Sequence, residues 1–441
     1  MLRQLAQLAF CLLATCALPA QSLFGHPLFL GGQINYIFQQ HGAFPAAFSG
    51  PNSLVSNPED ALSRVLTFPS GVQAGRHDEF LFDLEETGGQ GLSTVLGMAG
   101  FTNLDAVRNP QLGTAPYVAR LFWTHQIALG DGESDQQPGF LATFRRVPRR
   151  RLLIHVGKFS LPDFFDLNAV GGDSHLQFMN WTIDQNGAYD YAADTRGYTV
   201  GAVVEYEAPS WSARFAETLM PKVANGIDLQ WNLSRARSEN LEFEYRPQAA
   251  WWKAHPATFR VLGYANLANM GVYRNAVNAF LAGATSVPDI TAHPFQPRRK
   301  PGFGLNLEQQ LAPGITAFAR AGWADGRYES FAYTEVEQTV AGGVTILGDR
   351  WRRPRDRAGL AAVVNGISGD HRRYLALGGV GFLLGDGGLR YGHERIAEAF
   401  YTLHWFDGVF LSPDLQYVVN PGYDSARGPV GVTSARLHVD F

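Results

Sequence analysis

VTSARLHVDF, residues 432–441, ends the chain and alternates apolar with polar side chains. Because a strand has a period of two, its register decides both faces at once. One face would carry Ala435, Leu437, Val439 and Phe441 toward lipid, and the other Ser434, Arg436, His438 and Asp440 toward a wet lumen. This pattern is typical of the strand that closes a transmembrane β-barrel, where no backbone group can stay unpaired. An ordinary amphipathic edge strand would show the same alternation.

The first twenty residues predict a secretory signal peptide. Arg3 precedes an apolar run from Leu8 to Leu18, and the small residue Ala20 follows. We expect cleavage after Ala20, with Ala17 as the alternative; a lipoprotein site at Cys16 fits less well, because Thr15 precedes it. Both cysteines of the chain, Cys11 and Cys16, lie in this segment 1–20. The mature domain, 21–441, would therefore contain no disulfide.

Composition narrows the class of protein further. Hydrophobic residues make up 46% of the chain, yet beyond residue 20 no apolar run reaches the ~18 residues of a membrane helix. A barrel or a soluble fold remains. The formal net charge of −4 gives no polybasic face for nucleic acid. Only four of the 36 basic residues are Lys, and the planar fork of Arg suits fixed donors in a pore, although a plain surface preference is the alternative.

Alternating segments bounded by Gly, Pro, Asn or Asp recur along the whole mature chain. They predict sixteen strands, at 28–40, 62–69, 79–86, 116–130, 151–159, 197–207, 210–218, 239–246, 257–267, 302–311, 314–323, 334–347, 356–365, 395–405, 408–419 and 432–441. An even count puts both termini on one side, expected to be the periplasm. A barrel of about sixteen strands leaves an aqueous passage, so the pattern favours a channel. Two tandem soluble sandwiches are the alternative.

Connection lengths support this topology, because the turns on one side of such a barrel are short and the loops on the other are long. The connections 208–209, 312–313 and 406–407 are tight and fall on one side. The opposite side receives the long connections 87–115, 160–196, 268–301 and 366–394. One connection disagrees: 131–150 falls among the turns, yet it is as long as a loop.

Several long stretches, in the same order along the chain, resemble the OprB type of carbohydrate-selective porin from Gram-negative outer membranes. They include VGKFSLPDFFDLN (156–168), FMNWTIDQNGAYDYAADTRGYTVGA (178–202), GFGLNLEQQL (302–311), FARAGWADGRYESFAYTE (318–335), HRRYLALGGVGFLLGDGGLRYGHERIAEAFYTL (371–403) and NPGYDSARGPVGVTSARLHVDF (420–441). The resemblance implies a sixteen-stranded, all-β, up-and-down barrel that passes small sugars by facilitated diffusion, without catalysis. The segments 41–78 and 145–151 (RRVPRRR) resemble the family least.

Sugar selectivity needs donors and acceptors for hydroxyl groups and aromatic faces for the C–H side of a pyranose. Loop 160–196 is rich in both, and by analogy with porins in general we expect it to fold inward as a constriction loop. Its candidates are Asp163, Asp166, Asn168, Asn180, Trp181, Asp184, Asn186, Tyr189, Asp190, Tyr191, Asp194 and Arg196. The loop could instead be a solvated cover or a packed plug.

Strand parity adds a second group of candidates. We expect the cations Arg120, Lys158, Arg260 and Arg320 to point into the lumen and to face Glu85, Glu242, Glu244 and Glu308. Opposed rows would offer weak hydrogen-bond sites that let solute leave, although the same groups could pair with one another to satisfy the wall. Trp323, Asp325 and Arg327 are expected near the mouth of the pore.

Three rival classes remain. A general or anion-preferring porin would use the same barrel. An outer-membrane hydrolase could draw on His125, His155, His371, His393 and His404, but neither a G-x-S-x-G nor an H-E-x-x-H motif occurs. A structural or adhesive barrel would bind partners through its long loops. We expect a channel rather than an enzyme, with no cofactor and no metal.

The expected surroundings follow from the barrel hypothesis. The permeating solutes would be small sugars, and the outer wall would contact the lipid bilayer and lipopolysaccharide. The terminal Phe441 would be read by the barrel assembly machinery. A homotrimer could form through the small and apolar outer face of 356–365.

Overall fold

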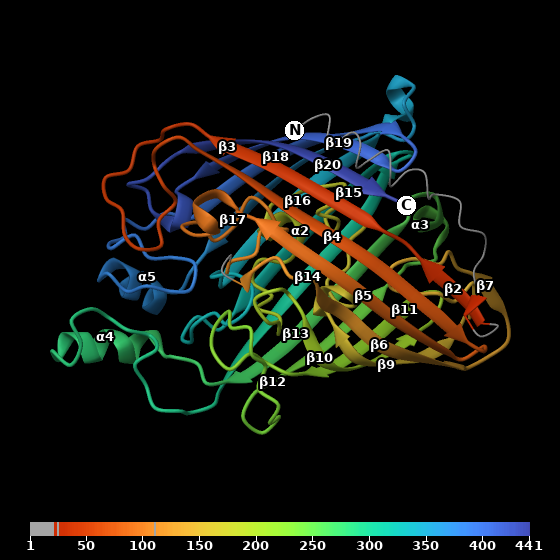
Figure 1. Ribbon diagram of the computed structural model, residues 1–441, viewed down its shortest axis with the longest axis horizontal. Helices are drawn as coiled ribbons and strands as arrows, with labels where there is room; N and C mark the ends of the chain where they lie inside the picture. The colour runs from red at the N-terminus through yellow and green to blue at the C-terminus, as the bar shows by residue number, and fades with distance from the viewer. Residues whose placement is uncertain (1–21, 24–25, 110–111) are drawn as a thin grey trace.

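The computed structural model describes residues 22–23, 26–109 and 112–441. It is an antiparallel β-barrel in which sixteen strands pair in chain order and β20 closes on β3 (Figure 1). The predicted signal peptide, with Cys11 and Cys16, lies outside the described residues. No helix in the described part of the chain is long and apolar enough to cross a membrane.

The wall consists of β3 (Gln33–His41), β4 (Glu59–Ala74), β5 (Asp78–Gly89), β6 (Tyr117–Ala128), β9 (Arg151–Phe159), β10 (Thr199–Glu207), β11 (Trp211–Thr218), β12 (Arg237–Tyr245), β13 (Ala257–Ala268), β14 (Arg298–Ala312), β15 (Ile315–Ala324), β16 (Gln338–Leu347), β17 (Arg357–Gly366), β18 (Glu394–Phe406), β19 (Val409–Val419) and β20 (Val430–Asp440). β2 (His26–Leu30) extends the line of β3 and pairs with β4. The further strands are β1 (Ser22–Leu23), β7 (Glu133–Asp135) and β8 (Arg146–Pro148). The α-helices are α2 (Trp181–Asp184), α3 (Ala250–Ala254), α4 (Tyr273–Leu281) and α5 (Gly369–Ala376), and short 3-10 turns are η1 (Leu92–Thr94), η3 (Leu161–Asp163), η4 (Gly348–Trp351) and η5 (Pro421–Tyr423).

All sixteen predicted strands are confirmed, with shifted ends. The first differs most, because the expected strand 28–40 is divided into β2 and β3 at Gly31 and Gly32. There the backbone of Gly32 exchanges hydrogen bonds of 2.9 and 3.0 Å with that of Phe441. A Cβ on Gly32 would lie 2.2 Å from the Phe441 ring, so a larger residue there would require that ring to move.

The two faces of the wall follow the predicted alternation. On β12, Leu241 and Phe243 are exposed on the outside, whereas Glu242 and Glu244 are buried inside. On β20, Ser434, Arg436 and His438 are buried toward the lumen, as predicted. Val439 is the exception: it shares the outer face but is buried, because it lies between its register partners Val409 and Ile34.

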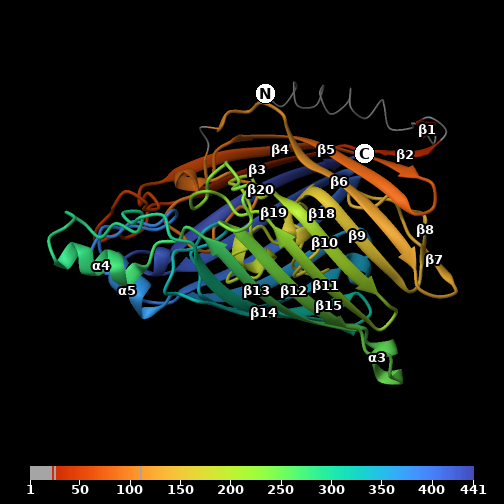
Figure 2. The ribbon, with the colours of Figure 1, turned by 90° about the horizontal axis from the view of Figure 1, so that it is seen from below.

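The two ends of the barrel differ in their connections. We call the end with residues 208–210, 313–314 and 407–408 the turn end, and the opposite end, with α4 and α5, the loop end. Figure 2 shows α3, β7 and β8 at the turn end and the α4–α5 pair at the loop end. The long connection 129–150 does belong to the turn end, where it forms the β7–β8 hairpin.

Two long connections turn back into the lumen. Loop 160–198, between β9 and β10, carries α2, which packs against β16 and β17. Loop 90–116, between β5 and β6, places Leu92, Met98 and Phe101 in the apolar core that forms inside the barrel. The interior is therefore filled by loops rather than by wall side chains alone.

Candidate permeation site

Inward-facing side chains of the wall hold loop 160–198 by its backbone. Glu398 of β18 accepts from the amides of Met179 and Asn180 at 2.6 and 3.2 Å. Glu242 of β12 accepts from the amide of Asp166 at 2.8 Å. Buried backbone donors need such partners, so these wall carboxylates fix the path of the loop through the lumen.

Arg320 of β15 is a third buried anchor, with 2% of its surface exposed. Its guanidinium donates to the carbonyls of Gly171 and Ile183 at 2.6 and 2.8 Å. It also pairs with Asp166 at 3.0 Å. A single side chain thus ties three points of the loop to one strand.

Loop 90–116 is held in the same way, by side chains of β18 and β19. Glu394 of β18 accepts from the amides of Ala99 and Gly100 at 3.1 and 2.6 Å. Gln416 of β19 donates to the carbonyl of Thr102 at 2.9 Å. The two loops meet where the indole N–H of Trp181 donates to the carbonyl of Asn103 at 2.6 Å.

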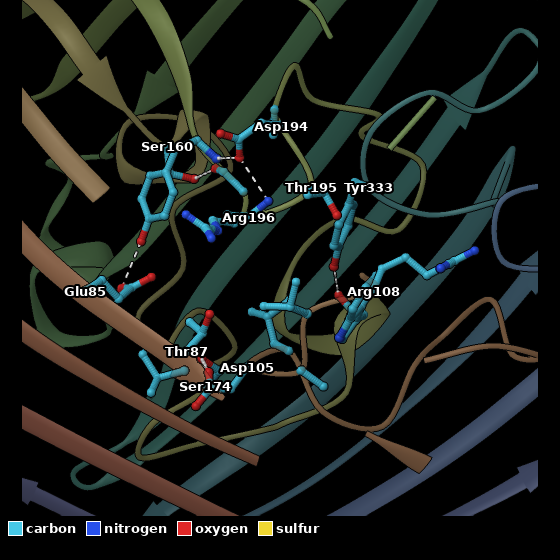
Figure 3. Close-up of a pocket in the computed structure, with 18 of the residues that line it drawn as sticks. Glu85, Thr87, Asp105, Arg108, Ser160, Ser174, Asp194, Thr195, Arg196 and Tyr333 are labelled. Atoms are coloured by element: carbon cyan, nitrogen blue, oxygen red, sulfur yellow. Dashed lines mark hydrogen bonds between the residues drawn. The ribbon is translucent and has the colours of Figure 1, made fainter. Parts of the chain in front are cut away.

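Between these loops and the inner faces of β3 to β6 lies a cavity of about 240 Å³, which we call the upper cavity (Figure 3). Its polar lining comes from Glu85, Thr87, Asp105, Arg108, Arg120, Ser160, Ser174, His175, Asp194, Thr195 and Arg196, and its aromatic lining from Trp181, Tyr191, Tyr198 and Tyr333. The cavity therefore combines charged donors, acceptors and ring faces, which is the chemistry that binds a hydroxylated ring.

Two arginines reach the upper cavity without a carboxylate partner among the described contacts. The Arg196 guanidinium lies over the Tyr117 ring at 3.9 Å, and its buried Nε has no hydrogen-bond partner in the described part of the chain. The Arg108 Nε donates to the carbonyl of Phe382 at 2.7 Å. Figure 3 shows Arg196 and Asp194 across the space from Asp105 and Thr87, with Arg108 beside Tyr333.

Burial and pairing set the charges on the loop residues of this cavity. Burial lowers the pKa of His175, but the Asp105 carboxylate, 3.4 Å away, outweighs it and raises the pKa to about 9. Burial works to raise the pKa of Asp105, but His175 and Asn35 outweigh it, so that pKa is lowered. Burial raises the pKa of Asp194. At neutral pH the cavity therefore holds a charged His175–Asp105 pair.

Arg120 marks the floor of the upper cavity. It binds Asp163 in bidentate fashion, at 2.8 and 2.7 Å, and Asp83 at 3.0 Å. Nearby, Glu85 accepts from the hydroxyls of Tyr198 and Thr67 at 3.0 and 3.2 Å. Arg120 is thus fully paired, whereas Glu85 is surrounded by hydroxyl donors of the kind a sugar also carries.

A ladder of charges runs along the inner wall of β10 to β14, below loop 160–198. Arg214 contacts Glu242 at 3.0 Å and Glu244 at 3.1 Å. Arg260 contacts Glu244 at 2.8 Å and Glu308 at 2.7 Å. The expected rows of Arg and carboxylate do face the lumen, and they pair with one another.

The predicted site residues separate into groups. Glu85, Arg120, Trp181 and Arg196 line the upper cavity. Asp166, Arg260 and Glu308 line a second cavity of about 320 Å³, and Asp163 a third of about 190 Å³. Asn180, Asp190 and Arg320 are enclosed by the loop and the wall that they bond to.

Two predictions, at Lys158 and Trp323, need correction. Lys158 does not have inward parity, because its register partner is Leu121, which is exposed on the outer face; its ammonium donates to the Val118 carbonyl within the wall. Trp323 lies on the outer face beside Phe303, with 39% of its surface exposed. Arg327 and Asp325 follow β15 at the loop end, where they pair with each other and the Arg327 side chain is largely exposed. Their place at this end agrees with the expected position near the mouth.

Sequence reasoning missed the contribution of loop 90–116. Asp105 and Arg108 of this loop line the upper cavity, as do Thr87 of β5 and His175 of loop 160–198. The available signal was the apolar set Val95, Met98 and Phe101, because a connection that stays outside the barrel has little reason to carry buried residues. Among the described residues, no group of three or more His, Cys, Asp or Glu could hold a metal ion.

Comparisons with known proteins identify the family of this chain. The profile of the family described as "Carbohydrate-selective porin, OprB family" matches residues 73–441. The high-pH structure of Pseudomonas putida OprB shares the fold at a TM-score of 0.70, with 15% identity over 94% of each chain. No match is found among curated protein sequences.

Two further solved structures align with TM-scores of 0.49. The low-pH structure of Pseudomonas putida OprB has 12% identity over 93% of this chain and 92% of that chain. The outer membrane channel DcaP of Acinetobacter baumannii has 11% identity over 96% and 100%. The family match spans fourteen of the wall strands fully and the end of β4. This chain belongs to the OprB family of carbohydrate-selective porins, channels of the Gram-negative outer membrane.

Proposed function

We propose that this porin passes small neutral sugars by facilitated diffusion and that the upper cavity is its selective region, with loop 160–198 as the constriction loop. The observation that carries the proposal is the lining of the cavity, where Arg196 and Arg108 lie opposite Asp105 and Glu85 within one enclosed space. Sugar hydroxyls can donate to the carboxylates and accept from the guanidinium groups. No single contact would hold the solute strongly, so it can leave.

The balance of charge argues against strong anion selectivity. The four cations Arg108, Arg120, Arg196 and His175 share the lining with three carboxylates, Glu85, Asp105 and Asp194, which leaves an excess of one positive charge. The aromatic members, Trp181 and Tyr333, stack with ring centroids 5.6 Å apart. Such rings offer a face to the C–H side of a pyranose rather than to a free anion.

We further propose that the turn end faces the periplasm and the loop end the outside, as short and long connections do in such barrels. The mature chain would begin after a signal peptide of residues 1–20. The other proposed partners are lipopolysaccharide at the outer wall, the assembly machinery at Phe441, and a second and third copy at the outer face of β17, where Leu360 and Val364 are exposed.

Liposome swelling tests the sugar selectivity. Purified protein in liposomes is compared in glucose, a disaccharide and an uncharged non-sugar of similar size to glucose. We expect the fastest influx for glucose. Equal influx rates for all small solutes would show that the protein is a general porin. A large reversal potential in a salt gradient would instead favour an anion-preferring porin.

A further inference from the structure

The connection 129–150 at the turn end is far longer than its neighbours. Glu133–Asp135 and Arg146–Pro148 pair as the β7–β8 hairpin, and the Gln136 amide continues the ladder to the Arg145 carbonyl at 2.9 Å. We call residues 133–148 the exit hairpin and residues 137–144 its tip. A turn that only joined β6 to β9 would need a few residues, so the remaining length calls for another role.

The tip enters the barrel. Thr143 donates from its amide and its hydroxyl to one oxygen of Glu79, at 2.6 and 2.8 Å, and the Phe144 amide donates to the same oxygen at 3.2 Å. Glu79 is an inward residue of β5 with 2% of its surface exposed. Phe144 is equally buried. A buried carboxylate that accepts three hydrogen bonds fixes the tip against the inner wall.

The wall also leaves room for the tip. A Cβ on Gly71, an inward position of β4, would lie 2.3 Å from the Thr143 methyl group. Phe140 meets Phe29 of β2 edge to face, with ring centroids 6.4 Å apart, and Phe29 is the register partner of Gly71. The tip therefore covers the inner faces of β2, β4 and β5.

The arginine-rich sequence explains the base of this hairpin. Arg145, Arg146, Arg149 and Arg150 are exposed, whereas Val147 between them is buried. The charged side chains stay in water at the turn end while the apolar residues enter the lumen. The stretch 145–151 thus marks where the chain leaves the barrel.

The space left beside the tip is a cavity of about 190 Å³, which we call the lower cavity. Leu141 and Ala142 of the tip form one side, and Arg151, Glu205 and Arg214 of the opposite wall form the other. Asp163 and Phe164 of loop 160–198 also line it. Because Asp163 binds Arg120, which lines the upper cavity, the two cavities adjoin across that ion pair.

We propose that the exit hairpin forms a second constriction, in series with the upper cavity. This constriction would confine departing solute to a path along the wall that carries Arg214 and its carboxylate partners. The proposal rests on the proposed function, because a filter needs a conducting pore. Its polar side, Arg151, Arg214 and Glu205, suits the same small hydroxylated solutes. The tip is seated by hydrogen bonds and packing, so the constriction is a fixed one.

Replacing the tip, residues 137–144, by Asn-Gly between Gln136 and Arg145 tests the proposal, since this dipeptide closes a two-residue hairpin. We expect single-channel conductance in planar bilayers to rise by about 1.5- to 2-fold, the limit for removing one of two similar resistances in series. The matched control shortens α3 at the same end, whose residues Ala250–Ala254 include no buried side chain. That control should conduct like the unmodified protein.

A milder variant guards against misfolding. Gly71→Val should push the tip off the wall without a deletion and raise conductance in the same direction. Leu153→Cys, in the lower cavity, gives a chemical readout, because the only cysteines of the chain are Cys11 and Cys16 in the predicted signal peptide. A bulky thiol reagent should label it faster once the tip is shortened.

Unchanged conductance and unchanged labelling in a folded, tip-shortened barrel would overturn the second constriction. This outcome is distinct from failure of the proposed function, which shows as equal influx of glucose and non-sugars in the unmodified protein. A conductance rise that also occurs in the α3 control would equally count against the hairpin.

Discussion

Loop 160–198 and the connection 269–297 are both long and lie at the same end of the barrel, yet one fills the lumen and the other extends beyond it. Residues of the first are largely buried. In the second, Leu281, Val287 and Phe295 are more than half exposed, and α4 packs on α5 outside the wall. Length alone therefore does not send a loop inward.

What differs is the wall that each loop meets. Glu242, Glu398 and Arg320 point into the lumen and find backbone partners in loop 160–198. The α4–α5 pair packs through the buried rings of Tyr273 and His371, whose centroids are 4.1 Å apart. Its ion pair, Arg274 with Asp370 at 3.1 Å, is exposed. Buried charge that is paired costs much to disrupt, whereas exposed charge contributes little.

The largest effect is expected at Arg320. Arg320→Ala removes the donor to Gly171, Ile183 and Asp166 and leaves Asp166 buried without its cation. We expect the free energy of unfolding to fall by about 3–5 kcal/mol, as when one partner of a buried ion pair is removed. Urea titration in detergent micelles, followed by tryptophan fluorescence, measures it.

Arg327→Ala is the matched control, because Arg327 lies at the end of the same strand with an exposed side chain. Its effect should stay below about 1 kcal/mol. If the two variants were equally stable, the wall would not be what holds the loop.

At Arg196 the effect should appear in transport rather than stability. Arg196→Gln removes a guanidinium with no carboxylate partner among the described contacts. We expect glucose influx to fall about tenfold, the equivalent of about 1.4 kcal/mol, which is near the value of one hydrogen bond to a charged group. Arg235→Gln is the control, since Arg235 makes a similar contact with Phe295 outside the lumen. If glucose influx were equal in both variants, Arg196 would have no part in sugar passage.

The pairing of His175 with Asp105 should make the stability of the folded protein depend on pH. Its pKa is raised to about 9 in the folded loop, above the ordinary 6.5, so the proton favours the folded state. That contribution is fully present below about pH 6.5 and is lost as pH rises through 9. Unfolding at pH 7 and pH 10 should show a loss in the unmodified protein that His175→Gln does not show. A parallel decline in both proteins would contradict the Asp105 pairing.

The smallest effect is expected in the outer connection. Arg274→Ala removes an ion pair whose arginine side chain is 70% exposed. The free energy of unfolding should change by less than about 1 kcal/mol, and single-channel conductance should not change. A large change in conductance would mean that α4 takes part in the passage of solute.

The sequence predicted the wall well because each wall residue obeys a local rule. Alternation on one strand, such as Leu241, Glu242 and Phe243, is visible without any knowledge of its neighbours. The error at Lys158 was one of assignment: it lies two residues after the outward Val156 in an unbroken register, so the same rule puts it on the outer face.

The candidate site was less accessible, because it is formed by contacts between distant segments. Arg320 was predicted to meet solute from its parity, but only the folded loop shows that it bonds carbonyls of Gly171 and Ile183. Arg108 lies on a loop without periodicity, so no pattern marks it. Loop positions depend on tertiary partners that a single sequence does not display.

The most direct test of the account is a crystal structure of the protein grown with glucose. We predict that loop 160–198 lies in the lumen, with the sugar bound in the upper cavity between Arg196, Asp105 and Glu85. A structure in which this loop extends outside the barrel, or in which glucose binds elsewhere and leaves the upper cavity to solvent, would contradict it.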